Sequence, residues 1–248
     1  MKINEFLDAT YLKTARQAGL SEKENLHKVL QLTEEAIANE YKLIMVRARH
    51  IGNVKTALAV VKSPVLIGTV IDFPEGNSTT EEKLQEAQKA MYAGAHELDF
   101  VLNYNAFKAG DISLLTDEIT QCTALCLEHH KVVKFIIEVA ALSNEEIIVI
   151  SQLIKKVVLE NFGEENAKNV FVKSSTGFFK MHTSKSNGAT IESMKLISKN
   201  AKPLKIKAAG GVRDYPMALK MLALGVDRIG TSSSKEIINE AHNTNLEH

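Results

Sequence analysis

The chain has 248 residues, of which 45% are hydrophobic and 24% are charged, a composition typical of a soluble globular protein. Thirty basic and thirty acidic residues cancel, so no overall field attracts nucleic acid or an anionic membrane, and we expect neither as a partner. No apolar run at the N-terminus resembles a signal peptide, and no segment approaches the length of a membrane span.

The sequence contains two cysteines, Cys122 and Cys126, which fits a reducing compartment and excludes a disulfide scaffold. Their spacing puts them on one helix face, but no cluster of histidines or acids completes a ligand set, so we predict buried side chains and no metal site. The last residues, 246–248, resemble the start of an engineered histidine tag. The predicted domain is therefore 1–245.

The first half of the chain alternates between short apolar runs and segments with helical spacing of apolar residues. We predict strands at 6–12, 43–46, 65–71 and 97–102, and helices near 21–37, 53–62, 79–93 and 112–129. Capping boxes mark the start of two helices, at Ser21 with Glu24 and at Thr79 with Glu82. Gly94 suits the C-terminal cap of the helix that Thr79 begins.

The second half repeats the alternation. We predict strands at 132–139, 170–173, 204–209 and 227–230, helices at 143–160, 191–200, 215–224 and after Ser234, and a long loop at 179–189. Eight strand–helix units without a linker predict an α/β protein with a single (β/α)₈ TIM barrel. The rival fold, an open doubly wound sheet, usually carries a Gly-x-Gly-x-x-Gly turn after its first strand, which this sequence lacks.

The barrel predicts that the chemistry lies at the carboxyl ends of the strands. Lys173 ends an apolar strand and is followed by the hydroxyl-rich turn 174–178. Desolvation at such a place lowers the pKa of a lysine, which makes it an amine nucleophile near neutral pH. The alternative is a lysine at a strand end that simply reaches solvent.

Other polar residues interrupt the apolar strands, and strand alternation indicates which of them share a face. Glu97 shares a face with Asp99, Lys134 with Glu138, and Lys205 with Lys207, although Lys205 could instead lie at the barrel rim. The interrupting residues that we consider candidates are Asp8, Asp99, Lys134, Glu138, Lys173 and Lys207. Because isolated buried charges are costly, these groups either meet around a reaction centre or form a structural layer of ion pairs.

The pair Lys173 and Lys207 favours a reaction centre, because the two lysines come from adjacent strands. Two ammonium groups a few Å apart repel by a few kcal/mol at an effective dielectric constant of about 20, so one of them should lose its proton. With Asp99 as an acid–base partner, a neutral amine is suited to Schiff-base chemistry on a carbonyl.

Glycine and hydroxyl residues follow the last three predicted strands. They are Thr176, Gly177, Gly210, Gly211, Ser232 and Ser233. In this fold the loops after the last strands commonly bind phosphate, because glycines let backbone N–H groups approach the anion and hydroxyls add donors. Arg213 either pairs with the same phosphate or is a solvated residue near a helix cap.

The segments 172–178 and 205–213 closely resemble the motifs of the deoxyribose-phosphate aldolase family, as do 97–103 and 134–138. The resemblance runs from about residue 7 to residue 234 in the family's order. It implies a cytoplasmic class I aldolase on a (β/α)₈ barrel, without a metal or other cofactor. Such an enzyme cleaves 2-deoxy-D-ribose 5-phosphate reversibly to D-glyceraldehyde 3-phosphate and acetaldehyde, and we expect a homodimer or homotetramer.

The resemblance also implies roles for residues. Lys173 would be the Schiff-base lysine, Lys207 the lysine that lowers its pKa, and Asp99 the proton donor and acceptor. Lys134 would support this network, and Asp8 would contact substrate hydroxyls. The turns that match the family's phosphate contacts are those with Thr176, Gly177, Gly210, Gly211, Ser232 and Ser233.

Three features depart from the family pattern. The second strand ends in 44–47, Ile-Met-Val-Arg, where a cysteine-containing motif is usual. The loop at 178–189 is longer than in many members. No aromatic residue follows Ile238 to act as a C-terminal proton shuttle. Two other functions stay open: a different phosphate-binding barrel enzyme, such as another class I aldolase or a sugar-phosphate isomerase, and a non-catalytic sensor of sugar phosphates.

Overall fold

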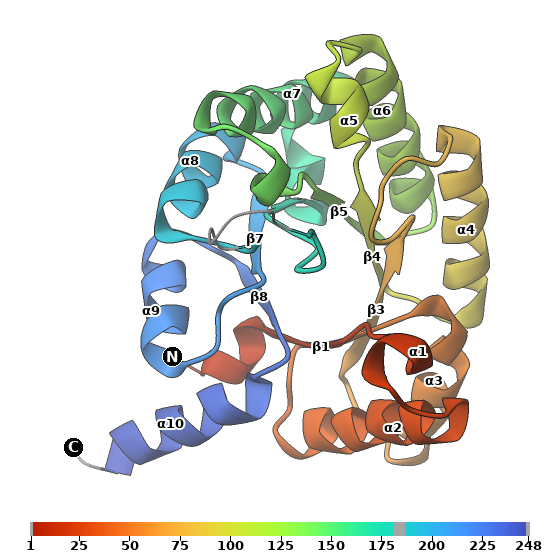
Figure 1. Ribbon diagram of the computed structural model, residues 1–248, viewed down its shortest axis with the longest axis vertical. Helices are drawn as coiled ribbons and strands as arrows, with labels where there is room; N and C mark the ends of the chain where they lie inside the picture. Colours follow the sequence, from red (N-terminus) through yellow and green to blue (C-terminus); the bar gives the residue numbers. More distant parts are fainter. Residues whose placement is uncertain (1, 181–186, 247–248) are drawn as a thin grey trace.

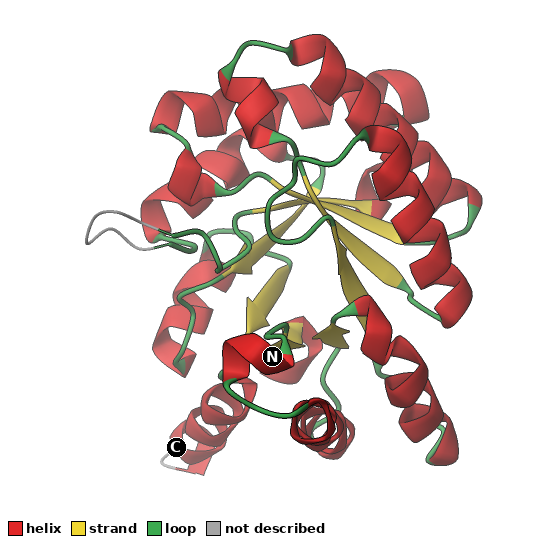
Figure 2. Ribbon diagram, turned by 45° about the vertical axis from the view of Figure 1, so that its right-hand side comes forward, coloured by secondary structure: helices red, strands yellow, loops and turns green. Residues whose placement is uncertain are grey.

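A computed structural model describes residues 2–180 and 187–246. Its eight strands pair in parallel and in chain order, and β1 pairs with both β2 and β8, which closes the barrel. Figure 1 looks down this barrel, with the strands at the centre and the helices around them. Figure 2 shows the same arrangement turned by 45°, with helices covering the outside of the strands. The predicted TIM barrel is confirmed.

The strands are short and almost wholly buried, as expected for parallel strands covered by helices. They are β1 Leu7–Tyr11, β2 Leu43–Val46, β3 Leu66–Ile71, β4 Glu97–Val101, β5 Val132–Ile136, β6 Val170–Lys173, β7 Lys205–Ala209 and β8 Arg228–Thr231. Each predicted strand is present, with ends that differ by up to three residues.

The helices pack their apolar faces on the strands. They are α1 Ala15–Ala18, α2 Glu22–Ala38, α3 Ile51–Val60, α4 Thr80–Ala93, α5 Tyr104–Lys108, α6 Ile112–Glu128, α7 Asn144–Phe162, α8 Ile191–Ala201, α9 Tyr215–Ala223 and α10 Ser234–Leu246. Short 3₁₀ helices occupy Ile3–Phe6, Ala48–His50, Val139–Ala141 and Glu164–Asn169. Sequence periodicity did not predict α1 and α5, because helices of four and five residues are too short to show it.

The predicted caps are confirmed. The side chain of Ser21 accepts a hydrogen bond from the backbone N–H of Glu24, and Thr79 does the same with Glu82, each within a full capping box. Gly94 ends α4 at a positive φ of 120°. Cys122 and Cys126 are both buried on α6, as predicted.

One prediction about β5 is wrong. The strand ends at Ile136, and Glu138 has a left-handed backbone with φ of 54°. Lys134 and Glu138 therefore do not share the face of one continuous strand. The side chain of Glu138 instead accepts a hydrogen bond from the backbone N–H of Thr176 at 3.1 Å, beyond the end of β6.

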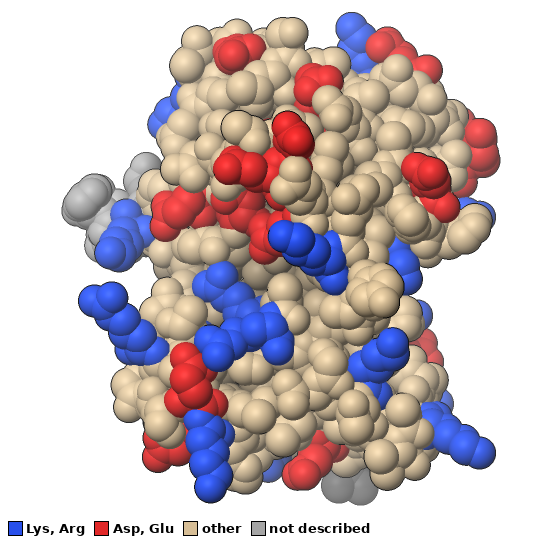
Figure 3. Space-filling view, turned by 90° about the vertical axis from the view of Figure 1, so that its right-hand side faces the viewer, with Lys and Arg blue, Asp and Glu red and all other residues tan. Residues whose placement is uncertain are grey.

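Charge on the outside is mixed. The face of the molecule in Figure 3 carries clusters of both basic and acidic side chains, in keeping with a net charge of zero. In the described part of the chain, no helix combines the length and apolar character that crossing a membrane requires. Part of the predicted long loop, 181–186, and the end of the tag-like segment, 247–248, lie outside the described residues.

Candidate active site

A cavity of about 590 Å³ opens at the carboxyl end of the barrel. Its lining comes from the ends of β1, β6, β7 and β8 and the loops that follow them. Lys173 lines this cavity, at the last position of β6. The sequence predicted the reacting groups at this end of the strands, which is where TIM-barrel enzymes carry their active sites.

Three lysines surround the carboxylate of Asp99 inside the barrel. The ammonium nitrogens of Lys173 and Lys207 each lie 2.8 Å from Asp99 Oδ2. The ammonium nitrogen of Lys134 lies 3.0 Å from the other oxygen, Oδ1. Strand pairing produces this arrangement, because Asp99 is in register with Lys134, and Lys173 is in register with Lys207.

Two further acids and an arginine extend the network below the cavity. Lys207 Nζ lies 2.6 Å from Asp8 Oδ2, and Arg228 Nε donates to Asp8 Oδ1 at 2.7 Å. Arg228 also reaches Glu97 Oε1 at 3.2 Å, and Glu97 contacts Lys134. The network thus links four basic side chains with three carboxylates.

The network has one more basic group than it has carboxylates, and Lys173 is the basic group with the fewest carboxylate partners. Arg228, Lys134 and Lys207 each contact two carboxylates, whereas among the described residues Lys173 forms an ion pair with Asp99 alone, which it shares. If all seven groups were ionised, one positive charge would be left over in a buried place. Loss of the proton from Lys173 neutralises the network at the least cost.

The pKa shifts agree with this assignment. Burial lowers the pKa of Lys173 to about 8, and the positive charges of Lys207 and Lys134 add to the decrease, while Asp99 opposes it. Burial also acts on Lys134, but Asp99 and Glu97 raise its pKa above the ordinary value, so Lys134 stays charged. Lys173 is therefore the group in this network that is prepared to act as a neutral amine.

Asp99 stays ionised in the same surroundings. Burial alone would raise the pKa of Asp99, but Lys134, Lys173 and Lys207 outweigh burial and hold it well below the usual range. Arg228 and Lys207 lower the pKa of Asp8 against the effect of burial in the same way. Both carboxylates are fully buried.

Asp8, which the resemblance implies to contact substrate hydroxyls, belongs to the buried charged network. Its carboxylate is held by Arg228 and Lys207, and Asp8 is not among the described residues that line the cavity. The cavity lining near β1 instead includes Thr10, the residue two positions later on the strand.

The glycine turns after β6, β7 and β8 line the same cavity. Thr176, Gly177, Gly210, Gly211 and Ser232 all line it. The three glycines have positive φ values of 77°, 78° and 84°, a backbone conformation that residues with a Cβ rarely adopt. These turns place backbone groups and hydroxyls at one end of the cavity, a composition that suits an anion.

Two predicted members of the phosphate site differ in position. Ser232 lines the cavity and is exposed, whereas Ser233 is not among the described lining residues, and its backbone N–H donates to Thr231 Oγ1 at 2.9 Å. Arg213 and Lys13 also line the cavity, and both side chains are exposed. The mouth therefore carries two cations beside the glycine turns.

An apolar cluster lies where the second strand departs from the family pattern, and two of its members, Leu12 and Phe178, line the cavity. Met45 packs in a cluster with Leu12, Leu43 and Val70, against which Phe73 and Phe178 pack. The guanidinium of Arg47 donates to the backbone oxygens of Leu12 and Phe73, each at 2.9 Å, and lies 4.7 Å from the Phe73 ring centroid. Arg47 thus ties the loops after β1 and β3 together.

Sequence reasoning missed Arg228 and treated Glu97 only as a neighbour of Asp99. Arg228 is in register with Lys207 on the adjacent strand, and it is almost fully buried. The sequence did contain a signal for Arg228, because it is a charged residue within a predicted strand, where alternation assigns each side chain to one face of the sheet.

The comparisons with known proteins agree with this geometry. A model of the DeoC/LacD family aldolases matches residues 12–233. The chain is 36% identical to a deoxyribose-phosphate aldolase of Thermococcus gammatolerans, with 98% of each chain covered. A solved structure described as QR15, an aldolase, has a TM-score of 0.78 and 32% identity, with 100% of this chain and 99% of the other covered. A tetrameric deoxyribose phosphate aldolase from Aeropyrum pernix shares the fold, with a TM-score of 0.77, 24% identity, and 98% and 92% coverage.

Proposed function

This chain belongs to the DeoC/LacD family of aldolases, and we propose that it is a deoxyribose-phosphate aldolase with Lys173 as its Schiff-base lysine. The observation that carries the assignment of Lys173 is its buried ammonium group, which lines the cavity and has a pKa of about 8. A class I aldolase needs such an amine, because only the neutral form attacks a carbonyl.

The lowered pKa has a large effect on the amount of nucleophile. At pH 7, a lysine with a pKa of about 8 is neutral in about 9% of molecules, against about 0.03% at the ordinary value of 10.5. The reactive fraction is therefore about 300-fold larger than for a solvated lysine.

The reaction then follows from ordinary amine chemistry. Neutral Lys173 attacks C1 of open-chain 2-deoxy-D-ribose 5-phosphate, and loss of water gives an iminium. When the C3 hydroxyl loses its proton, the C2–C3 bond breaks and its electrons move to the iminium nitrogen. D-Glyceraldehyde 3-phosphate leaves, protonation at C2 restores the iminium, and water releases acetaldehyde and the free amine.

Asp99 is the group that we propose for proton transfer around Lys173. Its Oδ2 lies 2.8 Å from both Lys173 Nζ and Lys207 Nζ, so it can accept and return protons during formation of the iminium. The positive charge of Lys207 lowers the pKa of Lys173 and so favours the neutral amine. Lys134 balances Asp99 from the other side at 3.0 Å.

The phosphate would lie at the glycine turns, away from the reacting carbons. Backbone N–H groups near Gly177, Gly210 and Gly211 would bind it, with Ser232 and Ser233 adding hydroxyl donors. Binding of the substrate's phosphate at these turns would orient C1 toward Lys173 and make the attack effectively intramolecular. Asp8 would act through Lys207 and Arg228, which its carboxylate contacts.

Trapping with borohydride tests the proposal directly. Acetaldehyde and borohydride should convert one lysine to N-ethyllysine, a net gain of C2H4, and peptide mapping should locate it at Lys173. Absence of an adduct at every lysine would favour a sugar-phosphate sensor. An adduct without cleavage of 2-deoxy-D-ribose 5-phosphate would favour another class I aldolase, which a panel of sugar phosphates would identify.

The remaining expectations also rest on the family. We propose that residues 1–245 form one catalytic domain, that the enzyme is cytoplasmic, and that it acts in the breakdown of deoxynucleosides. We further propose a homodimer or homotetramer in solution, which light scattering on the purified chain would test. A monomer by that measurement would contradict the proposed assembly without affecting the chemistry.

A further inference from the structure

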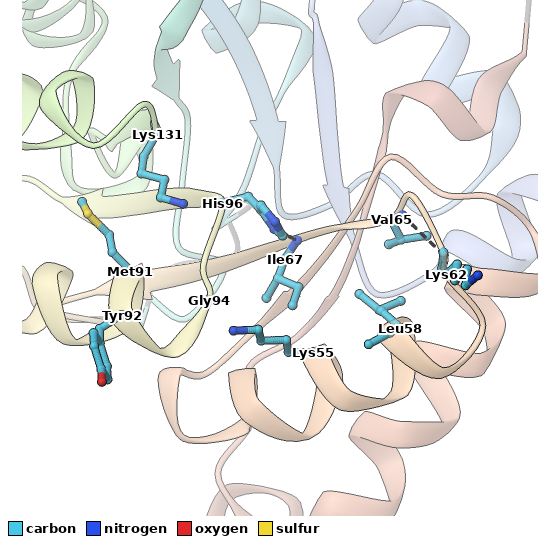
Figure 4. A pocket seen from close by; sticks show the side chains of 12 residues that line it. Lys55, Leu58, Lys62, Val65, Ile67, Met91, Tyr92, Gly94, His96 and Lys131 are labelled. Carbon is cyan, nitrogen blue, oxygen red and sulfur yellow. Dashed lines mark hydrogen bonds between the residues drawn. The ribbon is translucent and has the colours of Figure 1, made fainter.

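A second cavity, of about 420 Å³, lies at the amino-terminal end of the barrel (Figure 4). Residues of α3 and α4 and the starts of β3 to β5 line it, and none of them lines the cavity that contains Lys173. His96, which lines this second cavity, directly precedes β4, whereas Asp99 lies within that strand. The aldolase mechanism makes no use of this cavity.

The polar side chains of the second cavity can all donate hydrogen bonds, and half of them are lysines. Lys55, Lys62 and Lys131 line it together with His96, and no aspartate or glutamate is among the described lining residues. Nδ1 of His96 accepts the backbone N–H of Ile67 at 3.0 Å, so the neutral ring carries its hydrogen on Nε2. His96 can therefore donate a hydrogen bond without being protonated.

The positive charge of this cavity is not cancelled nearby. Within residues 2–180 and 187–246, no ion pair involves Lys55, Lys62 or Lys131. Partial burial, Lys131 and Lys55 lower the pKa of His96, and the one acid that opposes them is Glu97. Glu97 points into the barrel, where its carboxylate contacts other cations.

The shape of the cavity depends on Gly94. Figure 4 shows the ammonium group of Lys131 directed toward His96, while Lys55 lies across Gly94. A Cβ at Gly94 would come within 2.8 Å of Lys55 Cδ, so a side chain there would push Lys55 aside. Buried Leu58, Val65 and Ile67 supply an apolar floor.

We propose that this cavity binds a small organic phosphate ester, with the phosphate between Lys55, Lys131 and His96 and the carbon skeleton on the apolar floor. The two ammonium groups of this site match a doubly charged phosphate better than a singly charged carboxylate, and lysine is a common phosphate-binding residue. The volume lies within the range of small-molecule sites. The inference does not depend on the aldolase activity.

Phenyl phosphate is a suitable probe, because it combines a phosphate with a small apolar body. The full chain with isotope-labelled histidine would be titrated, and the His96 signal, assigned from a His96→Gln variant, would be followed by NMR. We expect a saturable shift of that signal at millimolar concentrations and a rise in the pKa of His96, since a bound dianion favours the charged ring. An unmoved His96 signal would overturn the proposal, and equal binding of benzoate would overturn the preference for phosphate.

Variants distinguish a specific binding site in the cavity from nonspecific attraction of anions to a lysine-rich surface. The double variant Lys55→Met/Lys131→Met should weaken binding at His96 by at least about tenfold, the effect of losing one charged hydrogen bond or more. Lys89→Met is the matched control, because Lys89 is an exposed lysine of α4 outside the cavity. Equal weakening in both variants, or in neither, would show that the cavity has no specific site.

Discussion

Lys173 and Lys207 lie side by side on β6 and β7, and their ammonium groups contact the same carboxylate oxygen, Oδ2 of Asp99, each at 2.8 Å. Their situations differ in one respect. Lys207 has a second carboxylate, that of Asp8, at 2.6 Å, whereas Lys173 faces the cavity. Lys207 is thus held by two carboxylates, whereas Lys173 has a pKa lowered to about 8, and this difference leads to the first prediction.

Replacement of Lys207 by leucine should raise the pKa of Lys173, because it removes a positive charge that helps to lower that pKa. The rate of cleavage near neutral pH should fall by about a hundredfold or more, as is typical when acid–base activation is lost. The measurement is the pH dependence of borohydride trapping with acetaldehyde, whose midpoint should move from about 8 to a higher pH.

Lys205→Met is the control for this experiment. Lys205 lies on the same strand, but it reaches the barrel rim, pairs with Asp227 at 2.8 Å, and has a side chain that is 42% exposed. Its loss should leave the trapping profile in place. If Lys207→Leu also left the profile and the rate unchanged, Lys207 would have no part in activating Lys173.

The lowered pKa of Lys173 also predicts a cost in stability. A lysine whose pKa is about 8 when folded and 10.5 when unfolded is harder to protonate in the folded protein. Below pH 8 this lowers the free energy of unfolding by on the order of 3 kcal/mol, and the cost disappears as the pH rises from 8 to 10.5.

Replacement of Lys173 by methionine should therefore abolish cleavage but make the protein more stable to urea at pH 7. Asp99 remains neutralised in this variant, because Lys134 and Lys207 still contact it. The gain in stability should shrink when the urea unfolding is repeated near pH 10. A variant that is less stable than the parent protein at pH 7 would mean that Lys173 is charged and stabilising in the folded state.

Sequence alternation indicated which polar side chains share a strand face, but not how the side chains of different strands pair. Asp99 and Lys134 were predicted as candidate polar residues of neighbouring strands, and the structure brings them within 3.0 Å. The stagger between strands cannot be read from one sequence. As a result Lys205, which starts β7, lies at the rim, whereas Arg228, which starts β8, lies opposite Lys207 inside the barrel.

The end of β5 shows a second limit of the sequence. Residues 132–139 are mostly apolar and contain β-branched side chains, so nothing in their pattern indicates an end at Ile136. The positive φ of Glu138 causes the change of direction, and tertiary contacts with the turn after β6 hold it there. Contacts between segments far apart in the chain outweigh local preference at this point.

Removal of metal ions should leave the activity intact. In the described part of the chain, no group of three or more histidine, cysteine, aspartate or glutamate side chains could hold a metal ion. The positive nitrogen of the Lys173 iminium supplies the electron sink that a metal ion supplies in other aldolases. Cleavage should proceed at the same rate in excess EDTA, with a metal-dependent aldolase treated in parallel as the control. Loss of activity that added zinc restores would contradict the Schiff-base mechanism.

Glu138 leads to the last prediction, because it connects the end of β5 to the turn that would bind phosphate. Its Oε2 contacts the hydroxyl of Thr176 and accepts the Thr176 backbone N–H at 3.1 Å, and Thr176 Oγ1 accepts the backbone N–H of Phe178 at 3.0 Å. Burial raises the pKa of Glu138. Its carboxyl group therefore fixes the turn between Lys173 and Gly177, which lines the cavity.

Replacement of Glu138 by glycine keeps the left-handed backbone at φ of 54° without strain but releases Thr176. We expect KM for 2-deoxy-D-ribose 5-phosphate to rise by about tenfold, the effect of losing a hydrogen bond to a charged group. The kinetic constants for 2-deoxy-D-ribose, which has no phosphate, should change much less. Glu138→Gln should recover most of the loss, because its amide oxygen can accept the same two hydrogen bonds. Equal loss with both substrates would mean that Glu138 supports the fold in general and not the phosphate turn.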